Sequence, residues 1–249
     1  MKEKMNLYIG RIVAFWALLV FASTMFLFIW FYLPCFVLQE PYKTRWHRTI
    51  SKIWMGLFLT LVGCRFTVKG KHHYNNVGPA IVICNHNSLI DVPVSTPFLP
   101  RANKTIAKKS FIYVPLFGWI YQFGSVIVDR KNDKSRRTSF EKMKRVLDSG
   151  LDMLIYPEGT RNRTNQPLKE FYAGAFRLAI ETKVPIIAQT IIGAKQIYNP
   201  DTPMLMQPGK VHIYFDQIDV TTYTSAETDK LKEDVKEIMR QRILNHLKN

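Results

Sequence analysis

The sequence of 249 residues contains few cysteines, and no two of them form a recognisable pair. Cys35, Cys64 and Cys84 lie far apart in apolar stretches, and neither a C-x-x-C pair nor the Cys/His spacing of a zinc site occurs. A disulfide framework and a structural zinc centre are therefore excluded. We expect the three cysteines to be small buried side chains in a reducing compartment.

Acidic residues are also scarce, because 19 Asp and Glu stand against 35 Lys and Arg, which gives a formal net charge of +16. Such a balance indicates a polyanionic partner, namely nucleic acid, an anionic membrane or a phosphorylated substrate. The sequence contains no nucleic-acid-binding motif, no internal repeat and no low-complexity linker. Nucleic acid is therefore not expected as a partner, and the length fits one sizeable domain with an appendage.

Charge is absent altogether from residues 12–38. Pro34 is expected to end or kink a helix there, and the residues before it would span roughly 33 Å as a helix, about one hydrocarbon core. The run is too long for the apolar region of a signal peptide, and no small-x-small cleavage site follows it. We therefore predict a membrane-associated helix, with a buried helix in a soluble core as the alternative.

The following segment predicts an amphipathic helix. Its apolar side chains recur at helical intervals and form one stripe, made of Trp46, Ile50, Ile53, Trp54, Leu57, Phe58 and Leu61. Arg45, Arg48 and Lys52 fall on the opposite face, a pattern that favours an anionic membrane surface over a helix facing a protein core. Residues 1–64 are predicted to form a membrane-associated hairpin of two helices that turns near residues 34–42. The first helix either spans the bilayer or enters one leaflet, and the sequence fits both.

Residues 65–249 alternate between short β-branched or apolar runs and helical stretches, which predicts an α/β domain with a mainly parallel central sheet flanked by helices. The predicted strands are residues 66–69, 80–84, 104–107, 125–128, 153–156, 186–190 and 211–215. The predicted helices are residues 89–98, 113–123, 135–147, 174–182 and 227–247, the last with a capping box between Thr224 and Glu227. Ligands of such sheets bind beyond the carboxyl ends of the strands.

A histidine and an aspartate follow the predicted strand 80–84. His86 and Asp91 are five residues apart, so they would point about 140° apart on an unbroken helix. They can meet if His86 lies in the turn and Asp91 lies on the helix that follows. The carboxylate would then accept one ring N–H and leave the other ring nitrogen free as a base. Taken alone, however, this spacing favours a structural histidine.

Cations follow three further predicted strands, and they are Lys108, Arg130 and Arg161. Arg161 closes a Pro- and Gly-containing turn, residues 157–161, and supplies a planar fork for phosphate. Residues 101–145 hold twelve Lys and Arg against three acidic residues, a net charge of +9. Beside a His/Asp pair, several cations at strand ends indicate a site for a phosphorylated ligand.

Four short blocks occur in order along the chain. They are Asn85-His86 with Asp91; the segment from Lys108-Lys109-Ser110 through Pro115-Leu116-Phe117-Gly118-Trp119 to Val128-Asp129-Arg130; Tyr156-Pro157-Glu158-Gly159-Thr160-Arg161; and Val184-Pro185-Ile186-Ile187. In order and spacing these blocks resemble the glycerolipid acyltransferase family of bacterial 1-acylglycerol-3-phosphate acyltransferases (lysophosphatidic acid acyltransferases), over roughly residues 65–195. One block alone would not be specific, whereas four in order are.

The resemblance implies a role for each motif residue. His86 would act as general base on the free hydroxyl of a lysophospholipid, with Asp91 orienting the imidazole. The substrate phosphate would be bound by Arg130, Glu158, Gly159, Thr160 and Arg161. Lys108, or backbone amides near it, would help to stabilise the oxyanion. Transfer would be direct, so Cys84, expected as the last buried residue of a strand, would not carry an acyl group.

The resemblance implies no metal and no cofactor. Acyl-CoA or acyl-ACP (acyl carrier protein) would donate the acyl group to the sn-2 hydroxyl of lysophosphatidic acid and give phosphatidic acid. Both donors are polyanionic, so a charge of +16 does not distinguish them. The enzyme would lie on the cytoplasmic face of the (inner) membrane, in contact with anionic lipid.

Two alternatives remain at this point. A related enzyme would act on another lysolipid, such as a lyso-ornithine lipid or another lysophospholipid, or on glycerol 3-phosphate; several cations near the site favour an acceptor that carries phosphate. A non-catalytic basic module that binds anionic membrane is the alternative from a different class, and the His86–Asp91 pair argues against it.

Overall fold

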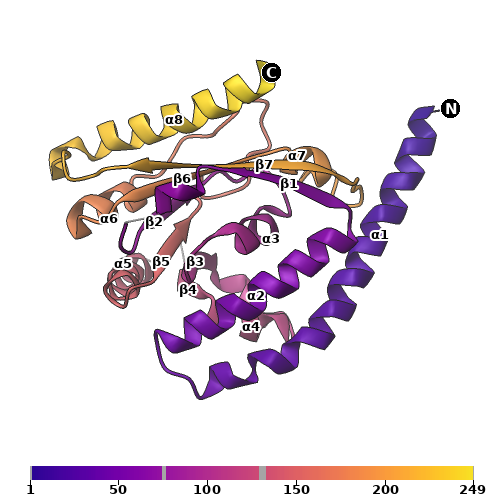
Figure 1. Ribbon diagram of the computed structural model, residues 1–249, viewed down its shortest axis with the longest axis horizontal. Helices are drawn as coiled ribbons and strands as arrows, with labels where there is room; N and C mark the ends of the chain where they lie inside the picture. Colours follow the sequence, from indigo (N-terminus) through magenta and orange to yellow (C-terminus); the bar gives the residue numbers. More distant parts are fainter. Residues whose placement is uncertain (1, 75–76, 129–132, 249) are drawn as a thin grey trace.

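The structure is a computed structural model that describes residues 2–74, 77–128 and 133–248. Within these residues the chain folds around a seven-stranded sheet with the spatial order β1-β7-β6-β2-β5-β3-β4 (Figure 1). The strands are β1 (Cys64–Lys69), β2 (Ile81–Cys84), β3 (Asn103–Lys108), β4 (Ser125–Val128), β5 (Asp152–Ile155), β6 (Ile186–Ile192) and β7 (Gly209–Ile218). All seven predicted strands are confirmed, with bounds that differ by at most three residues.

The sheet is mainly parallel, as predicted. Strands β6, β2, β5, β3 and β4 run in one direction. Strand β7 is antiparallel to β6 and parallel to β1, so β1 and β7 run against the other five. Every residue of β2, β5 and β6 is buried, which is the pattern of strands covered by helices on both faces.

Helices cover both faces of this sheet. One face is covered by α5 (Asp133–Asp148), α6 (Gly174–Thr182) and α8 (Thr228–Lys248), whose buried side chains share one apolar core with the strands. The N-terminal helices lie against the other face, together with the short helices α3 (Asp91–Ser95) and α7 (Ala194–Ile197). Figure 1 shows α8 on one side of the strands and α1, α2 and α4 on the other.

The N-terminal segment is a helix that returns on itself. Helix α1 (Lys2–Phe28) continues into the 3₁₀ helix η1 (Ile29–Phe36), which contains Pro34, and α2 (Tyr42–Leu61) runs back beside it. The first element is therefore an α-helix extended by a 3₁₀ helix rather than one helix ended by Pro34. The Trp54 indole N–H donates to Thr24 Oγ1 over 2.9 Å and joins the two helices.

The prediction for the polar face of α2 is wrong at one residue. Of the predicted apolar stripe, Ile50, Trp54 and Phe58 are buried, while Trp46, Ile53, Leu57 and Leu61 are exposed. The periodicity places Arg48 with Arg45 and Lys52 on the polar face, yet it is only 7% exposed. That side of α2 lies over the loop before β3, where Arg48 Nη2 donates to Leu99 O. Helix α2 therefore presents apolar groups outward as well as inward.

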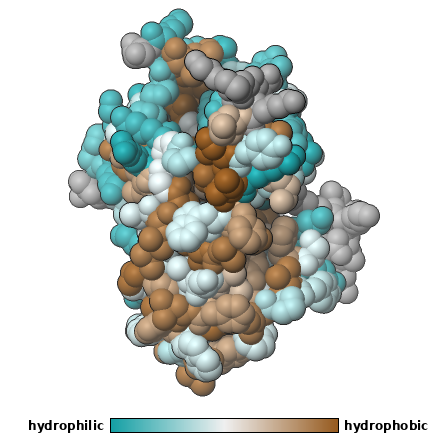
Figure 2. Space-filling view, turned by 90° about the vertical axis from the view of Figure 1, so that its right-hand side faces the viewer, coloured by the Kyte–Doolittle hydropathy of each residue, from teal (hydrophilic) through white to brown (hydrophobic). Residues whose placement is uncertain are grey.

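Much of α1 and η1 is covered by no other part of the protein. Residues Met5–Phe36 are long and apolar enough to cross a membrane, and only 22% of the most apolar stretch is buried. Ile12, Phe15, Leu18 and Trp30 are each more than half exposed. Figure 2 shows the resulting apolar surface on the side of the molecule where α1 lies. This exposure disfavours the alternative of a buried helix in a soluble core.

Some predicted helices are shorter than expected. The stretch 89–98 contains α3 and the 3₁₀ helix η3 (Thr96–Phe98). The stretch 113–123 contains only α4 (Phe117–Phe123), after the 3₁₀ helix η4 (Lys109–Tyr113), because Leu116 adopts a positive φ of 62° between them. The predicted capping box between Thr224 and Glu227 is confirmed, whereas α7 was not predicted. The remaining 3₁₀ helices are η2 (Lys71–Tyr74) and η5 (Ser225–Glu227).

Two neighbouring apolar residues of α8 provide a test of this packing. Met239 is fully buried against the sheet, and Ile238 beside it is 38% exposed. We expect Met239→Ala to lower the free energy of unfolding by about 2–5 kcal/mol through the cavity it leaves, and Ile238→Ala by about 1 kcal/mol or less. Urea unfolding of the detergent-solubilised chain measures both, and equal losses would contradict the described orientation of α8.

Candidate functional site

The exit of β2 is held by one side-chain amide. Asn85 is fully buried, its Nδ2 donates to Ile191 O over 2.9 Å, and its Oδ1 accepts from Ile191 N over 2.7 Å. Strand β2 ends at Cys84, so the side chain of Asn85 continues the pairing of β2 with the backbone of β6 by one residue. Ser88, three residues later, is fixed from the same side, because its hydroxyl lies 2.8 Å from both Ala194 O and Tyr198 O.

His86 and Asp91 meet in this turn. The ring Nδ1 of His86 lies 2.7 Å from Asp91 Oδ2, which also accepts from the backbone N–H groups of Asn87 and Ser88 over 2.7 and 2.8 Å. Asp91 is the first residue of α3, so the pair bridges a turn and a helix start. A carboxylate acceptor holds the proton on Nδ1 and leaves Nε2 unprotonated. The side chain of His86 is 15% exposed and that of Asp91 is fully buried.

An aromatic ring lies against the imidazole. The centroids of the His86 and Tyr156 rings are 4.6 Å apart, and the Tyr156 hydroxyl lies 3.2 Å from Ser95 Oγ on α3. The imidazole is therefore held at its edge by Asp91 and at its face by Tyr156. The sequence contained Tyr156 within a motif block but gave no indication of this contact.

Glu158 connects the exits of β2 and β5. Its carboxyl group is buried, with Oε1 accepting from His86 N over 2.7 Å and Oε2 from Lys169 N over 3.0 Å. Burial raises the pKa of Glu158, and these backbone N–H groups act in the opposite direction. Both oxygens of Glu158 accept from backbone N–H groups, and its predicted contact with a substrate phosphate stays a prediction. The residue positions the backbone of His86.

The loop after β5 wraps around the His86 turn. Arg161 Nε donates to Ser88 O over 3.1 Å, and Asn162 N donates to His86 O over 2.6 Å. Gly159 has a φ of 70°, a conformation that favours glycine. Thr160 Oγ1 accepts from Lys169 Nζ over 2.8 Å, which adds a cation that the sequence reading missed. Arg161 therefore lies beside the His86–Asp91 turn, as predicted.

One predicted cation, Lys108, makes no described contact with this cluster. Lys108 is exposed at the carboxyl end of β3, and β5 lies between β3 and β2. Among the described residues, no hydrogen bond or ion pair joins its side chain to His86, Asp91 or Arg161. Arg130 lies outside the described residues.

Cys84 is unsuited to act as a nucleophile. It is fully buried at the end of β2, and burial together with the nearby carboxylates of Asp91 and Glu158 raises its pKa well above the usual range of a thiol. Within residues 2–74, 77–128 and 133–248, no group of three His, Cys, Asp or Glu side chains lies close enough to hold a metal ion.

Comparison with known proteins places these residues in a family. Residues 65–192 match the family model described as Acyltransferase. The chain is 28% identical to a 1-acyl-sn-glycerol-3-phosphate acyltransferase of Cocos nucifera, over 88% of this chain and 70% of that protein. It is 30% identical to a protein of the same name from Haemophilus influenzae, over 76% of this chain and 79% of that protein.

A solved structure has the same fold. The crystal structure of the 1-acyl-sn-glycerophosphate (LPA) acyltransferase PlsC from Thermotoga maritima is similar over 100% of this chain and 98% of that one, with a TM-score of 0.81 and 21% sequence identity. The similarity includes the N-terminal helices, and it supports the described arrangement of the sheet and its covering helices.

The connecting role of Glu158 can be tested without an activity assay. Glu158→Ala removes the acceptor of the His86 and Lys169 backbone N–H groups, so we expect their amide hydrogen exchange to accelerate about 10-fold or more. The matched control is Glu141→Ala, at an exposed position on α5. Hydrogen–deuterium exchange read on peptides covering both amides measures the effect. Unchanged exchange in Glu158→Ala would show that this carboxyl group does not hold the turn.

Proposed function

This chain belongs to the Acyltransferase family, and we propose that it transfers a fatty acyl group from an acyl thioester to the sn-2 hydroxyl of lysophosphatidic acid, giving phosphatidic acid. The observation that carries the proposal is the 2.7 Å contact between His86 Nδ1 and Asp91 Oδ2, which leaves Nε2 available as a base. Membership of an enzyme family, together with this pair, argues against a non-catalytic membrane-binding module.

The pair performs the proton transfers of direct acylation. His86 Nε2 takes the proton of the acceptor hydroxyl as its oxygen attacks the thioester carbonyl carbon and forms the new C–O bond. The negative charge of Asp91 stabilises the imidazolium that results. When the C–S bond breaks, the imidazolium returns the proton to the leaving thiolate, so the enzyme ends in its starting state. No acyl-enzyme is required, consistent with the burial of Cys84.

Arg161 is the proposed ligand of the acceptor phosphate. Its Nε donates to Ser88 O, and among the described residues its two Nη groups have no hydrogen-bond partner. The guanidinium is thus held by the His86–Asp91 turn while its outer edge stays available for a planar, bidentate contact. Gly159 and Thr160 lie in the same loop and are proposed to contribute backbone and hydroxyl contacts. Arg130 is proposed as a further contact of the phosphate, and Lys108, or backbone amides near it, as a contact of the oxyanion.

The exposed apolar surface of α1, η1 and α2 supports a membrane-associated enzyme. Both the acceptor and the product carry fatty chains that reside in a bilayer. We propose that the N-terminal helices hold the chain on the cytoplasmic face of the (inner) membrane, because positive charge flanks the apolar run on both sides, in residues 2–11 and 43–52, which fits a hairpin with both ends on that face. The donor is proposed to be acyl-CoA or acyl-ACP, both polyanions that a net charge of +16 would attract.

The base role of His86 is tested by its removal. We expect His86→Ala to lower kcat for phosphatidic acid formation by about 10²–10⁴-fold, because a positioned general base contributes a factor of that size. His72→Ala removes an exposed histidine of η2 and should leave kcat unchanged. Release of free carrier thiol, followed with lysophosphatidic acid and acyl donor, measures the rate. A wild-type rate in His86→Ala would rule out the mechanism.

The phosphate role of Arg161 predicts a selective effect on the acceptor. We expect Arg161→Ala to raise KM for lysophosphatidic acid about 10-fold or more, since a charge-assisted bidentate contact is lost. The KM for a monoacylglycerol, which lacks the phosphate, should change much less. Arg163→Ala, two residues away and 65% exposed in its side chain, is the control. Equal changes for both acceptors would contradict a phosphate contact at Arg161.

A further inference from the structure

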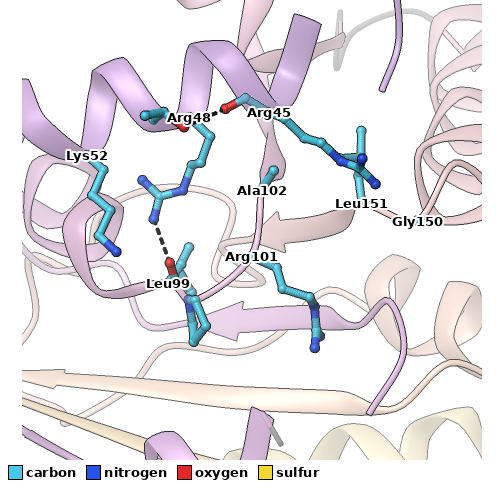
Figure 3. A pocket seen from close by; sticks show the side chains of 10 residues that line it. Arg45, Arg48, Lys52, Leu99, Arg101, Ala102, Gly150 and Leu151 are labelled. Atoms are coloured by element: carbon cyan, nitrogen blue, oxygen red, sulfur yellow. Dashed lines mark hydrogen bonds between the residues drawn. The ribbon is translucent and has the colours of Figure 1, made fainter. Parts of the chain in front are cut away.

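A cationic cavity lies beyond the amino ends of the central strands, at the opposite end of these strands from His86. It has a volume of about 370 Å³ and lies between α2 and the loops that lead into β3 and β5 (Figure 3). Residues 99–102 and 150–151 line it and come directly before these strands, whereas His86 follows the carboxyl end of β2. Because β2, β3 and β5 are parallel, the cavity and the His86 turn are at opposite ends of the strands.

Four cations line this cavity. Arg45, Arg48 and Lys52 project from successive turns of α2, and Arg101 comes from the loop before β3 (Figure 3). Only Arg101 has an acidic partner among the described residues, because its Nε lies 3.1 Å from Asp152 Oδ1. The cavity therefore carries a surplus of three positive charges after this one ion pair.

Arg48 is a buried cation with unused donors. It is 7% exposed, and only its Nη2 has a partner, Leu99 O at 3.1 Å. Its Nε and Nη1 are buried without a hydrogen-bond partner among the described residues, as is Nη2 of Arg101. Burial lowers the pKa of Arg48 to about 10, so it remains charged near neutral pH. An unpaired guanidinium is unfavourable in such surroundings, and an anion would relieve it.

Two further buried polar groups lie near Arg48. Asp152 Oδ2 and Tyr74 Oη are also buried without a partner in the described part of the chain. Asp152 Oδ1 accepts from Ala80 N and from Arg101 Nε, so one oxygen of this carboxylate is already occupied. Neither Asp152 nor Tyr74 lines the cavity, whereas Arg48 lines it from a buried position and Arg45 and Lys52 from exposed ones.

Helix α2, which carries three of the four cations, also exposes apolar side chains. Tyr42, Trp46 and Ile53 of α2 are 65%, 41% and 56% exposed, and they alternate along the helix with Arg45 and Lys52. Aromatic and aliphatic groups beside cations on one helix suit the boundary between lipid headgroups and acyl chains. Arginine and lysine donors together match the oxygens of a phosphate group.

We propose that this cavity is a second phosphate-binding site, which takes a phosphate monoester group such as the headgroup of phosphatidic acid. Arg48 binds the phosphate from the interior, and Arg45 and Lys52 close over it from the helix. The site is separate from Arg161 and does not take part in the acyl transfer. It attaches α2, and through it the sheet, to anionic headgroups.

Binding is tested in the detergent-solubilised 249-residue chain that carries Arg161→Ala, which removes the proposed phosphate contact at the other end of the strands. The probes are a short-chain phosphatidic acid, the matching phosphatidylcholine and inorganic phosphate, titrated calorimetrically without acyl donor. We expect phosphatidic acid to bind and phosphatidylcholine not to bind. Because no donor is present, the result does not depend on the proposed reaction.

Variants of the cavity identify the site. Arg48→Gln and the double variant Arg45→Gln/Lys52→Gln should each weaken binding about 10-fold or more. The control Arg177→Gln/Lys210→Gln removes the same charge from exposed positions on α6 and β7 and should change it less than about 2-fold. If Arg48→Gln unfolds, the double variant alone decides, because Arg45 and Lys52 are exposed.

The inorganic phosphate probe distinguishes a free phosphate group from a lipid headgroup as the ligand. Binding of inorganic phosphate that the cavity variants abolish would show that a free phosphate group is sufficient, whereas binding of the lipid alone would assign the site to a headgroup. Equal affinity in the cavity and control variants, or no binding of either phosphate probe, would overturn the proposal and leave a hydrated cavity.

Discussion

A single carboxylate oxygen, Asp91 Oδ2, determines the geometry of the candidate site. It accepts the ring N–H of His86 and the backbone N–H groups of Asn87 and Ser88. The two backbone contacts fix the turn, and the ring contact fixes the imidazole relative to that turn. A five-residue spacing that would separate the side chains on a regular helix thus brings them together, because α3 begins only at Asp91.

The surrounding structure supports this contact from three neighbouring strands. Asn85 ties the turn to β6, Glu158 ties it to the exit of β5, and Tyr156 covers the ring face. Each strand of this part of the sheet is buried on both sides, so the exits are held by a rigid core. Preorganisation of this kind is what general base catalysis at a fixed nitrogen requires.

The sequence predicted the parts that depend on local pattern. The strands follow from short apolar runs, and the meeting of His86 with Asp91 follows from a strand end and a helix start. The burial of Arg48 could not be predicted, because periodicity defines an apolar stripe but not which loop covers the neighbouring face. The strand order also could not be predicted: β5 lies between β2, which leads to His86, and β3, which ends at Lys108, and this order is a property of the whole fold. The backbone partners of Glu158 could not be predicted, because a motif gives residue types and not their hydrogen-bond partners.

The proposed mechanism requires that His86 presents an unprotonated Nε2 to the acceptor hydroxyl. The tautomer of the neutral ring measures this directly, through ¹⁵N chemical shifts of histidine-labelled protein in detergent, with the His86 signal assigned by its loss in a His86 variant. We expect a proton on Nδ1 and none on Nε2, because Nδ1 lies 2.7 Å from the Asp91 carboxylate. A neutral ring protonated on Nε2 would contradict the mechanism, because that nitrogen could not accept a proton.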